Sequence, residues 1–158
     1  MTSITYDDIY SRFLVSVNAY EVSSMLEDDA RVLLSEWLHS VRAIPKVRKI
    51  FSSIVLDGEL QKITYELKNS FTADDEETNN DFVIEVFGLG IAWRWSSQKY
   101  KSTLNTNQVY GGKEEKYYSQ ANHTDSLKEM QNVSKIDLYN LISQHVTANN
   151  SYLTQEES

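Results

Sequence analysis

Apolar residues recur every three or four positions between Leu26 and Val41, and this spacing constrains the fold more than any other feature. An α-helix turns once in about 3.6 residues, so the spacing gathers these side chains on one face. The members are Leu26, Ala30, Leu33, Leu34, Trp37, Leu38 and Val41. The residue before a proline disfavours the α conformation, so the helix is predicted to end ahead of Pro45, the only proline.

Helices are also predicted on both sides of this segment. Thr5 is placed to cap a helix over about residues 6–18, and Ile4 and Ile9 fit a hydrophobic staple across its start. A proline is well suited to the first turn of a helix, which predicts a short helix over residues 45–50. That short helix would carry the only dense basic patch of the sequence, Lys46, Arg48 and Lys49.

Residues 53–67 fit two different structures. Apolar residues over 56–67 recur with helical spacing, whereas those over 63–67 alternate as in a strand. The pair Asp57-Gly58 is typical of a hairpin turn. We predict a β-hairpin here, with a helix as the alternative. An isolated hairpin is marginally stable, so it is expected to lie on the helices or to pair with a neighbouring subunit.

A second strong apolar stripe predicts a central helix that Asn79 or Asn80 caps and that ends near Lys101. Its members are Phe82, Val83, Val86, Phe87, Ile91 and Trp95. Gly88 and Gly90 interrupt the pattern, and each lowers helix stability by about 1 kcal/mol relative to alanine. Glycines are tolerated in a helix most easily where another helix crosses closely, so a close crossing is expected here.

The preceding stretch, residues 72–80, is polar and acidic and is predicted to be a loop. It is expected to place negative charge near the start of the central helix, where the helix dipole favours it. A divalent metal site is the alternative. The spacing does not match a calcium loop, because the acids at 74–77 are consecutive and no glycine turn follows.

Residues 105–119 are predicted to form a connecting loop, and a final helical region with a break near Asn132 follows it. After Val146 the apolar pattern ends. The predicted fold class is therefore mainly α. It comprises a small helical bundle over residues 1–147, a possible β-hairpin near 53–67, and an extended polar C-terminal tail over 148–158.

Composition narrows the function. The chain has 158 residues, a net charge of −8 and no cysteine, so a thiolate zinc site and a cysteine nucleophile are excluded. A protein that grips phosphates needs excess Lys and Arg, which makes free nucleic-acid binding unexpected. No signal peptide is expected, and the apolar stretch 82–95 is too short to span a bilayer. The three histidines have no metal-ligand spacing, so we predict no cofactor, no metal and no catalysis.

Aromatic and basic residues alternate around the predicted loop. The interface candidates there are Tyr110, Lys113, Lys116, Tyr117 and Tyr118. Tyrosine offers a large contact area at low entropy cost and is enriched at protein interfaces, so we predict protein contact. Stacking on single-stranded bases and simple packing of the loop on its own helices are the alternatives.

Five strings of the sequence resemble a family of small structural proteins of tailed bacteriophages, the head-tail connectors or neck adaptors. They cover residues 4–13 (ITYDDIYSRF), 36–40 (EWLHS), 45–51 (PKVRKIF), 81–86 (DFVIEV) and 112–120 (GKEEKYYSQ). The similarity spans most of the chain, from Ile4 to about Val146.

The resemblance implies a structural virion protein. It would form a homo-oligomeric ring, dodecameric by analogy, beneath the portal protein, with a head-closure or tail protein below and DNA passing through the lumen without specific binding. It would reside in the virion neck, and in the host cytoplasm during assembly. The tail, with Tyr152 and Leu153, would be the segment that embraces the portal.

Other classes stay open at this point. An acidic inhibitor that mimics DNA would need carboxylates along one face at phosphate-like spacing. Another phage tail-completion protein would share the same composition. A hydrolase with carboxylates only would need a deep pocket holding an Asp or Glu whose pKa burial has raised.

Overall fold

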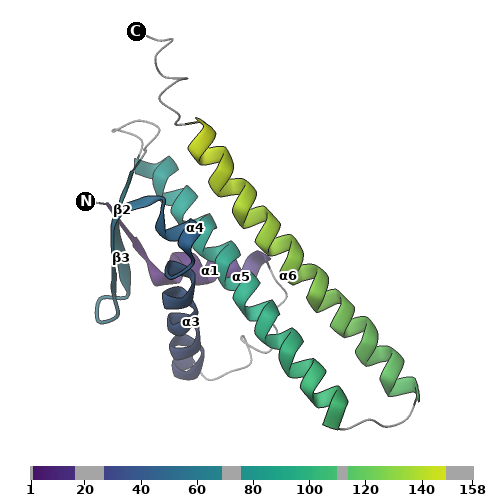
Figure 1. Ribbon diagram of the computed structural model, residues 1–158. Coiled ribbons are helices and arrows are strands. Elements are labelled where there is room, and N and C mark those ends of the chain that lie inside the picture. The colour runs from purple at the N-terminus through teal and green to yellow at the C-terminus, as the bar shows by residue number, and fades with distance from the viewer. Residues whose placement is uncertain (1, 17–26, 69–75, 110–113, 149–158) are drawn as a thin grey trace.

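The computed structural model describes residues 2–16, 27–68, 76–109 and 114–148, and Figure 1 shows their arrangement. This part of the chain is mostly helical, with five helices and one small antiparallel sheet, so the predicted fold class is confirmed. Two long helices, α5 (Glu76–Val109) and α6 (Glu114–Ala148), run antiparallel side by side. Each is about 50 Å long at about 1.5 Å per residue.

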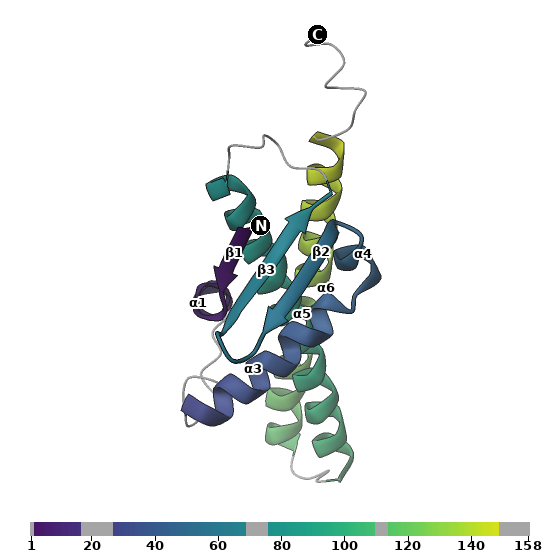
Figure 2. The same cartoon turned by 90° about the vertical axis from the view of Figure 1, so that its left-hand side faces the viewer.

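The sheet contains the predicted hairpin. Strands β2 (Phe51–Asp57) and β3 (Lys62–Leu67) pair antiparallel, so the hairpin prediction is correct and its helical alternative is wrong. A strand that was not predicted, β1 (Thr2–Thr5), pairs with the other side of β3. The order is therefore β1-β3-β2, as Figure 2 shows. The third strand supplies the partner that an isolated hairpin lacks.

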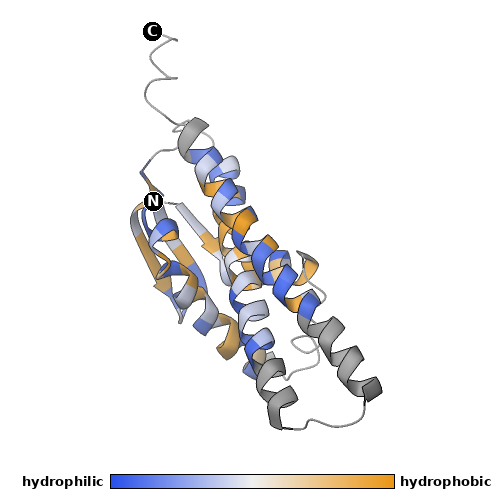
Figure 3. Cartoon of the chain, turned by 45° about the vertical axis from the view of Figure 1, so that its right-hand side comes forward, coloured by the Kyte–Doolittle hydropathy of each residue, from blue (hydrophilic) through white to orange (hydrophobic). Residues whose placement is uncertain are grey.

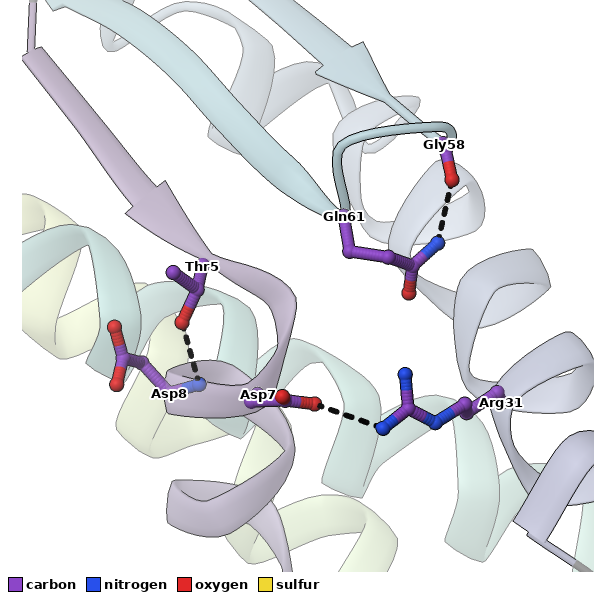
Figure 4. A network of polar contacts seen from close by, with 6 residues as sticks. All are labelled: Thr5, Asp7, Asp8, Arg31, Gly58 and Gln61. Atoms are coloured by element: carbon purple, nitrogen blue, oxygen red, sulfur yellow. Dashed lines mark hydrogen bonds and ion pairs between the residues drawn. The ribbon is translucent and has the colours of Figure 1, made fainter.

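The hairpin turn takes its shape from Asp57. One oxygen of its carboxylate accepts hydrogen bonds from the backbone N–H of Glu59 and of Leu60, each at 3.0 Å. The left-handed residue of the turn is Gln61, with φ of 52°, rather than Gly58. The Gln61 side chain donates to the Gly58 carbonyl at 2.6 Å (Figure 4). Aspartate's local bonds therefore define this turn more than glycine's freedom does.

Helix α1 (Tyr6–Ser16) begins as the sequence predicts. The backbone N–H of Asp8 donates to the Thr5 hydroxyl at 3.2 Å, which confirms Thr5 as the cap (Figure 4). Ile4 and Ile9 are both buried, as a hydrophobic staple requires. The remaining residues of the predicted range, 17 and 18, lie outside the described residues.

Helices α3 (Glu27–Arg42) and α4 (Pro45–Arg48) lie on either side of the proline as predicted, although α4 ends two residues before the predicted residue 50. Pro45 is the first residue of α4, as its fixed backbone favours. One part of the core forms where α1, α3 and α5 meet, and it continues to the sheet and to α6. Phe13 is fully buried there, with its ring at 6.2 Å from both Trp37 and Trp95.

The predicted acidic loop over 72–80 is wrong in its second half. Helix α5 begins at Glu76, so neither Asn79 nor Asn80 caps it. Glu76 and Glu77 occupy its first turn, where negative charge stabilises the helix dipole. Asn80 instead accepts a hydrogen bond from the Tyr65 hydroxyl at 2.5 Å and links α5 to the sheet.

The predicted loop over 105–119 and the break near Asn132 are also wrong. Helix α5 continues to Val109, α6 starts at Glu114, and α6 is continuous through Asn132. Helices in proteins draw most of their stability from tertiary packing, so two helices that run alongside each other extend further than their propensities indicate. Helices α5 and α6 together form a helical hairpin, and its end at Val109 and Glu114 projects away from the sheet in both views (Figures 1 and 2).

Candidate interaction surfaces

The outer face of α6 carries exposed apolar side chains. Val133 is 48% exposed and Ile136 is 56% exposed, one helical turn apart. The buried face of α6 is built by Leu127, Ser134, Leu138, Ile142 and His145 instead. We call Val133 and Ile136 the α6 apolar patch. Spacing alone does not say which side of a helix meets a partner, so the sequence does not indicate that these two side chains are exposed.

Further exposed apolar residues lie on other elements. Val15 near the end of α1 is 86% exposed, and Val32 on α3 is 62% exposed. Leu60 in the hairpin turn and Val55 on β2 are exposed as well. Single exposed apolar residues are ordinary on protein surfaces. Because they lie on several elements, the molecule has exposed apolar side chains on other surfaces besides the α6 apolar patch.

Cations and aromatic rings alternate where α4, α5 and α6 meet. The Lys46 Nζ lies 4.5 Å from the centre of the Tyr139 ring. The Lys135 Nζ lies 5.7 Å from the same ring centre and 5.5 Å from that of Trp93. The Arg94 guanidinium lies 4.7 Å from the Trp93 ring centre. We call these five residues the basic aromatic ladder. Each contact contributes about 0.5–1 kcal/mol where the groups remain partly solvated.

A groove of about 620 Å³ opens beside one end of this ladder. It lies between α4 and the last turns of α6, and we call it the α4–α6 groove. Its lining residues are Pro45, Lys46, Lys49, Ile50, Tyr139, Ile142 and Ser143. Ile50 and Ile142 are nearly fully buried, so they present only a thin apolar floor, and the two lysines stand at its edge.

A second hollow of about 470 Å³ lies on the other side of Pro45 and Lys49. Arg48, Lys49 and Lys68 contribute to its walls. The basic patch that the sequence indicates is therefore real in three dimensions, and Lys68, the residue after β3, adds to it. On a chain with a net charge of −8, a concentration of positive charge favours an acidic partner at this place.

Among the described residues, the groups whose pKa values depart from the ordinary range are tyrosines of the core. Burial, together with the charge of Glu76, raises the pKa of Tyr65 to about 12. Burial also raises the pKa values of Tyr6 and Tyr10. No three His, Asp or Glu side chains among the described residues lie close enough together to hold a metal ion. The perturbed groups therefore belong to the packed core, and none of them lines either hollow.

These tyrosines predict alkaline destabilisation. Tyr65 binds its proton more tightly in the folded chain than its ordinary value of 10.0, so its contribution is complete below pH 10 and is lost as pH rises towards 12. We expect the urea midpoint of unfolding to fall between pH 10 and pH 12, and Tyr65→Phe to reduce the size of this fall. An equal fall in the wild type and in Tyr65→Phe would contradict the prediction.

The sequence-predicted interface residues fall mostly outside the described part of the chain. Tyr110 and Lys113, as well as Tyr152 and Leu153, lie beyond it. Lys116, Tyr117 and Tyr118 lie on the first turns of α6 rather than in a loop. The structure therefore places these three at the projecting end of the helical hairpin, far along α6 from the α4–α6 groove.

Sequence reasoning missed the basic aromatic ladder and the α4–α6 groove. Lys46 was visible as part of a basic patch, but Trp93 and Tyr139 are 46 positions apart and only the pairing of α5 with α6 brings their rings to 6.0 Å. The hydropathy colouring in Figure 3 shows hydrophilic and hydrophobic residues alternating along both helices. Because hydrophilic and hydrophobic residues are mixed along each helix, the sequence of either helix alone does not predict the surface that the two helices form together.

Comparisons with protein families, with curated proteins and with solved structures find no match for this chain. Among the described residues, no helix is both long and apolar enough to cross a membrane.

Proposed function

We propose that this chain is a structural subunit of the bacteriophage neck, which assembles with copies of itself into a ring between the portal protein and a head-closure or tail protein. The observation that carries the proposal is the α6 apolar patch on a long helical hairpin. Val133 and Ile136 are exposed on this helix, and in the proposed ring a neighbouring subunit would cover them. The resemblance of the five sequence strings supplies the class of assembly.

A ring places particular demands on a subunit. Rings are built from heterologous contacts, in which two different faces of the subunit meet. The α6 apolar patch supports one such face, and exposed Val15 and Val32, on α1 and α3, support the other. The elongated hairpin also supports the proposal, because its length gives neighbouring subunits a large side-by-side contact.

The charge of the chain suits a DNA passage. With a net charge of −8, the average surface repels phosphates, so DNA would slide through a lumen without adhering. We also propose that Tyr152 and Leu153 contact the portal. Further protein contacts are proposed for Tyr110, Lys113, Lys116, Tyr117 and Tyr118.

The neck assignment is tested by an assembly experiment with variants of the α6 apolar patch. The chain is mixed with the portal protein of the same virus, and the assembly is followed by sedimentation and by electron microscopy of negatively stained particles. We expect the wild type to form rings that sediment with the portal. Ile136→Glu is expected to weaken ring formation at least tenfold, because it places a charge in an apolar contact.

The matched control is Gln144→Glu, which adds the same charge to an exposed position on the same helix. It is expected to assemble like the wild type. Absence of any wild-type ring on the portal across salt concentrations would refute the neck assignment. Equal assembly by Ile136→Glu and the wild type would instead remove the α6 apolar patch from the interface.

A further inference from the structure

The α4–α6 groove has a floor and an edge of different chemistry. Ile50 and Ile142 provide apolar surface below, the Tyr139 ring forms one wall, and Lys46 and Lys49 stand at the edge. A hollow of about 620 Å³ falls in the range that encloses a drug-sized ligand, so it has room for two large side chains. A peptide that pairs apolar anchors with carboxylates would satisfy both parts.

The chain itself contains such a segment directly after α6. Residues 149–158 read NNSYLTQEES, in which Tyr152 and Leu153 are followed by Glu156 and Glu157. Tyrosine and leucine supply the apolar anchors, and the two glutamates carry the charge opposite to the lysine edge. The order of anchors and then acids matches a groove with an apolar floor and a basic edge.

The position at which α6 ends brings this segment within reach. From Ser143 on the groove wall to Ala148 at the helix end, α6 rises about 7.5 Å. The four residues from there to Tyr152 span up to about 13 Å when extended. Asn149, Asn150 and Ser151 lie between, and these residue types favour chain reversal after a helix.

We propose that in the free chain residues 152–157 fold back onto the α4–α6 groove of the same molecule. Tyr152 and Leu153 cover Ile50, Tyr139 and Ile142, while Glu156 and Glu157 pair with Lys46 and Lys49. Intramolecular docking is favoured over docking on a second copy, because a short tether holds the segment at an effective concentration in the millimolar range.

This contact forms within the purified chain and does not depend on the neck assignment, which concerns binding to the portal. If the tail also binds a portal, the groove competes for the same residues, and release from it becomes a step of assembly. Failure of the crosslinking experiment below would leave the ring proposal untouched, and failure of the ring experiment would leave this contact untouched.

The contact is tested by photo-crosslinking in the full chain. A benzophenone amino acid replaces Thr154, between the anchors and the acids, and the crosslinked peptides are identified by mass spectrometry. We expect crosslinks to residues 45–50 and 139–143. An equal mixture of light and heavy isotope-labelled chains separates the two modes of docking, and the crosslinks are expected to join peptides of the same label.

Three variants test the specificity of the contact. Ser143→Trp fills the groove from an exposed wall position and is expected to reduce the crosslink yield about tenfold. Lys49→Glu is expected to reduce it about fivefold, in line with the strength of an exposed ion pair. Combining Lys46→Glu and Lys49→Glu with Glu156→Lys and Glu157→Lys, which reverses both sides of the contact, is expected to restore most of the yield.

The matched control is Lys128→Glu, the same charge change at an exposed position on α6 away from the groove. It is expected to leave the yield unchanged. The proposal would be overturned if Lys49→Glu and Lys128→Glu gave equal yields. It would also be overturned if crosslinks formed only between differently labelled chains, or if they were scattered over other surfaces. Yields insensitive to Ser143→Trp would overturn it too, and would point to another occupant such as residues 69–75, which combine Phe71 with Asp74 and Asp75.

Discussion

Gly90→Ala is expected to lower the free energy of unfolding by about 2 kcal/mol. A Cβ at this position would lie 2.5 Å from one methyl group of Val41 and 2.8 Å from the other, and Val41 is fully buried. Overpacking of this kind costs up to about 3 kcal/mol, because α3 and α5 must move apart. The better helix propensity of alanine returns about 1 kcal/mol. Chemical denaturation with urea measures the difference.

Gly88→Ala is the matched control on the same helix. Its added Cβ would meet the Arg12 Cγ at 3.2 Å, a milder contact that a shift of a few tenths of an ångström relieves. We expect it to be neutral or slightly stabilising. In a Val41→Ala background the penalty of Gly90→Ala should largely disappear, since the obstructing methyl groups are gone. An unchanged penalty in that background would contradict the close-crossing explanation.

Phe13→Ala is expected to lower the free energy of unfolding by about 3–5 kcal/mol. Phe13 is fully buried on α1, and its ring meets Trp37 of α3 and Trp95 of α5 edge-on at 6.2 Å. Its removal leaves a cavity where three helices join and also removes two aromatic contacts, each contributing about 0.5–1.5 kcal/mol. Domains of this size have a free energy of unfolding of about 5–15 kcal/mol, so the variant keeps only part of its stability.

Tryptophan fluorescence during urea unfolding measures this effect directly, because both neighbours of Phe13 are tryptophans. Val15→Ala on the same helix is the control. Its side chain is 86% exposed, so a change within about 0.5 kcal/mol is expected. A Phe13→Ala variant as stable as Val15→Ala would show that α1 does not belong to the cooperative core.

Some elements could be predicted from the sequence because local chemistry defines them. Thr5 caps α1 with its own hydroxyl, and Pro45 starts α4 because its backbone is already in the helical range. Asp57 bonds the backbone of the hairpin turn. Each of these signals acts over three or four residues, so no partner element is needed to recognise it.

Other elements depended on partners that the sequence does not indicate. Strand β1 has four residues, and its pairing with β3 joins positions about 60 residues apart. The length of α5 and α6 follows from their mutual packing rather than from the propensities of residues 105–119. Propensity and spacing therefore predicted loops where a second helix in fact stabilises helical backbone.

One candidate surface could be predicted from the sequence, and two others could not. The basic patch at Lys46, Arg48 and Lys49 is contiguous in sequence, so composition alone revealed it. The basic aromatic ladder and the α4–α6 groove combine α4 and Ile50 with α5 and α6, and no local pattern predicts them. A surface assembled from several elements becomes visible only when those elements are placed beside one another.

The sequence by itself determined that this chain is mainly helical and acidic, where its proline divides α3 from α4, and that Gly90 needs a close neighbour. Those properties arise from bonds and steric limits within a few residues. Only the tertiary structure decided that Val41 is that neighbour and that Val133 and Ile136 face outwards. Helical spacing says which side chains share a face, whereas the packing of other elements decides which face is buried.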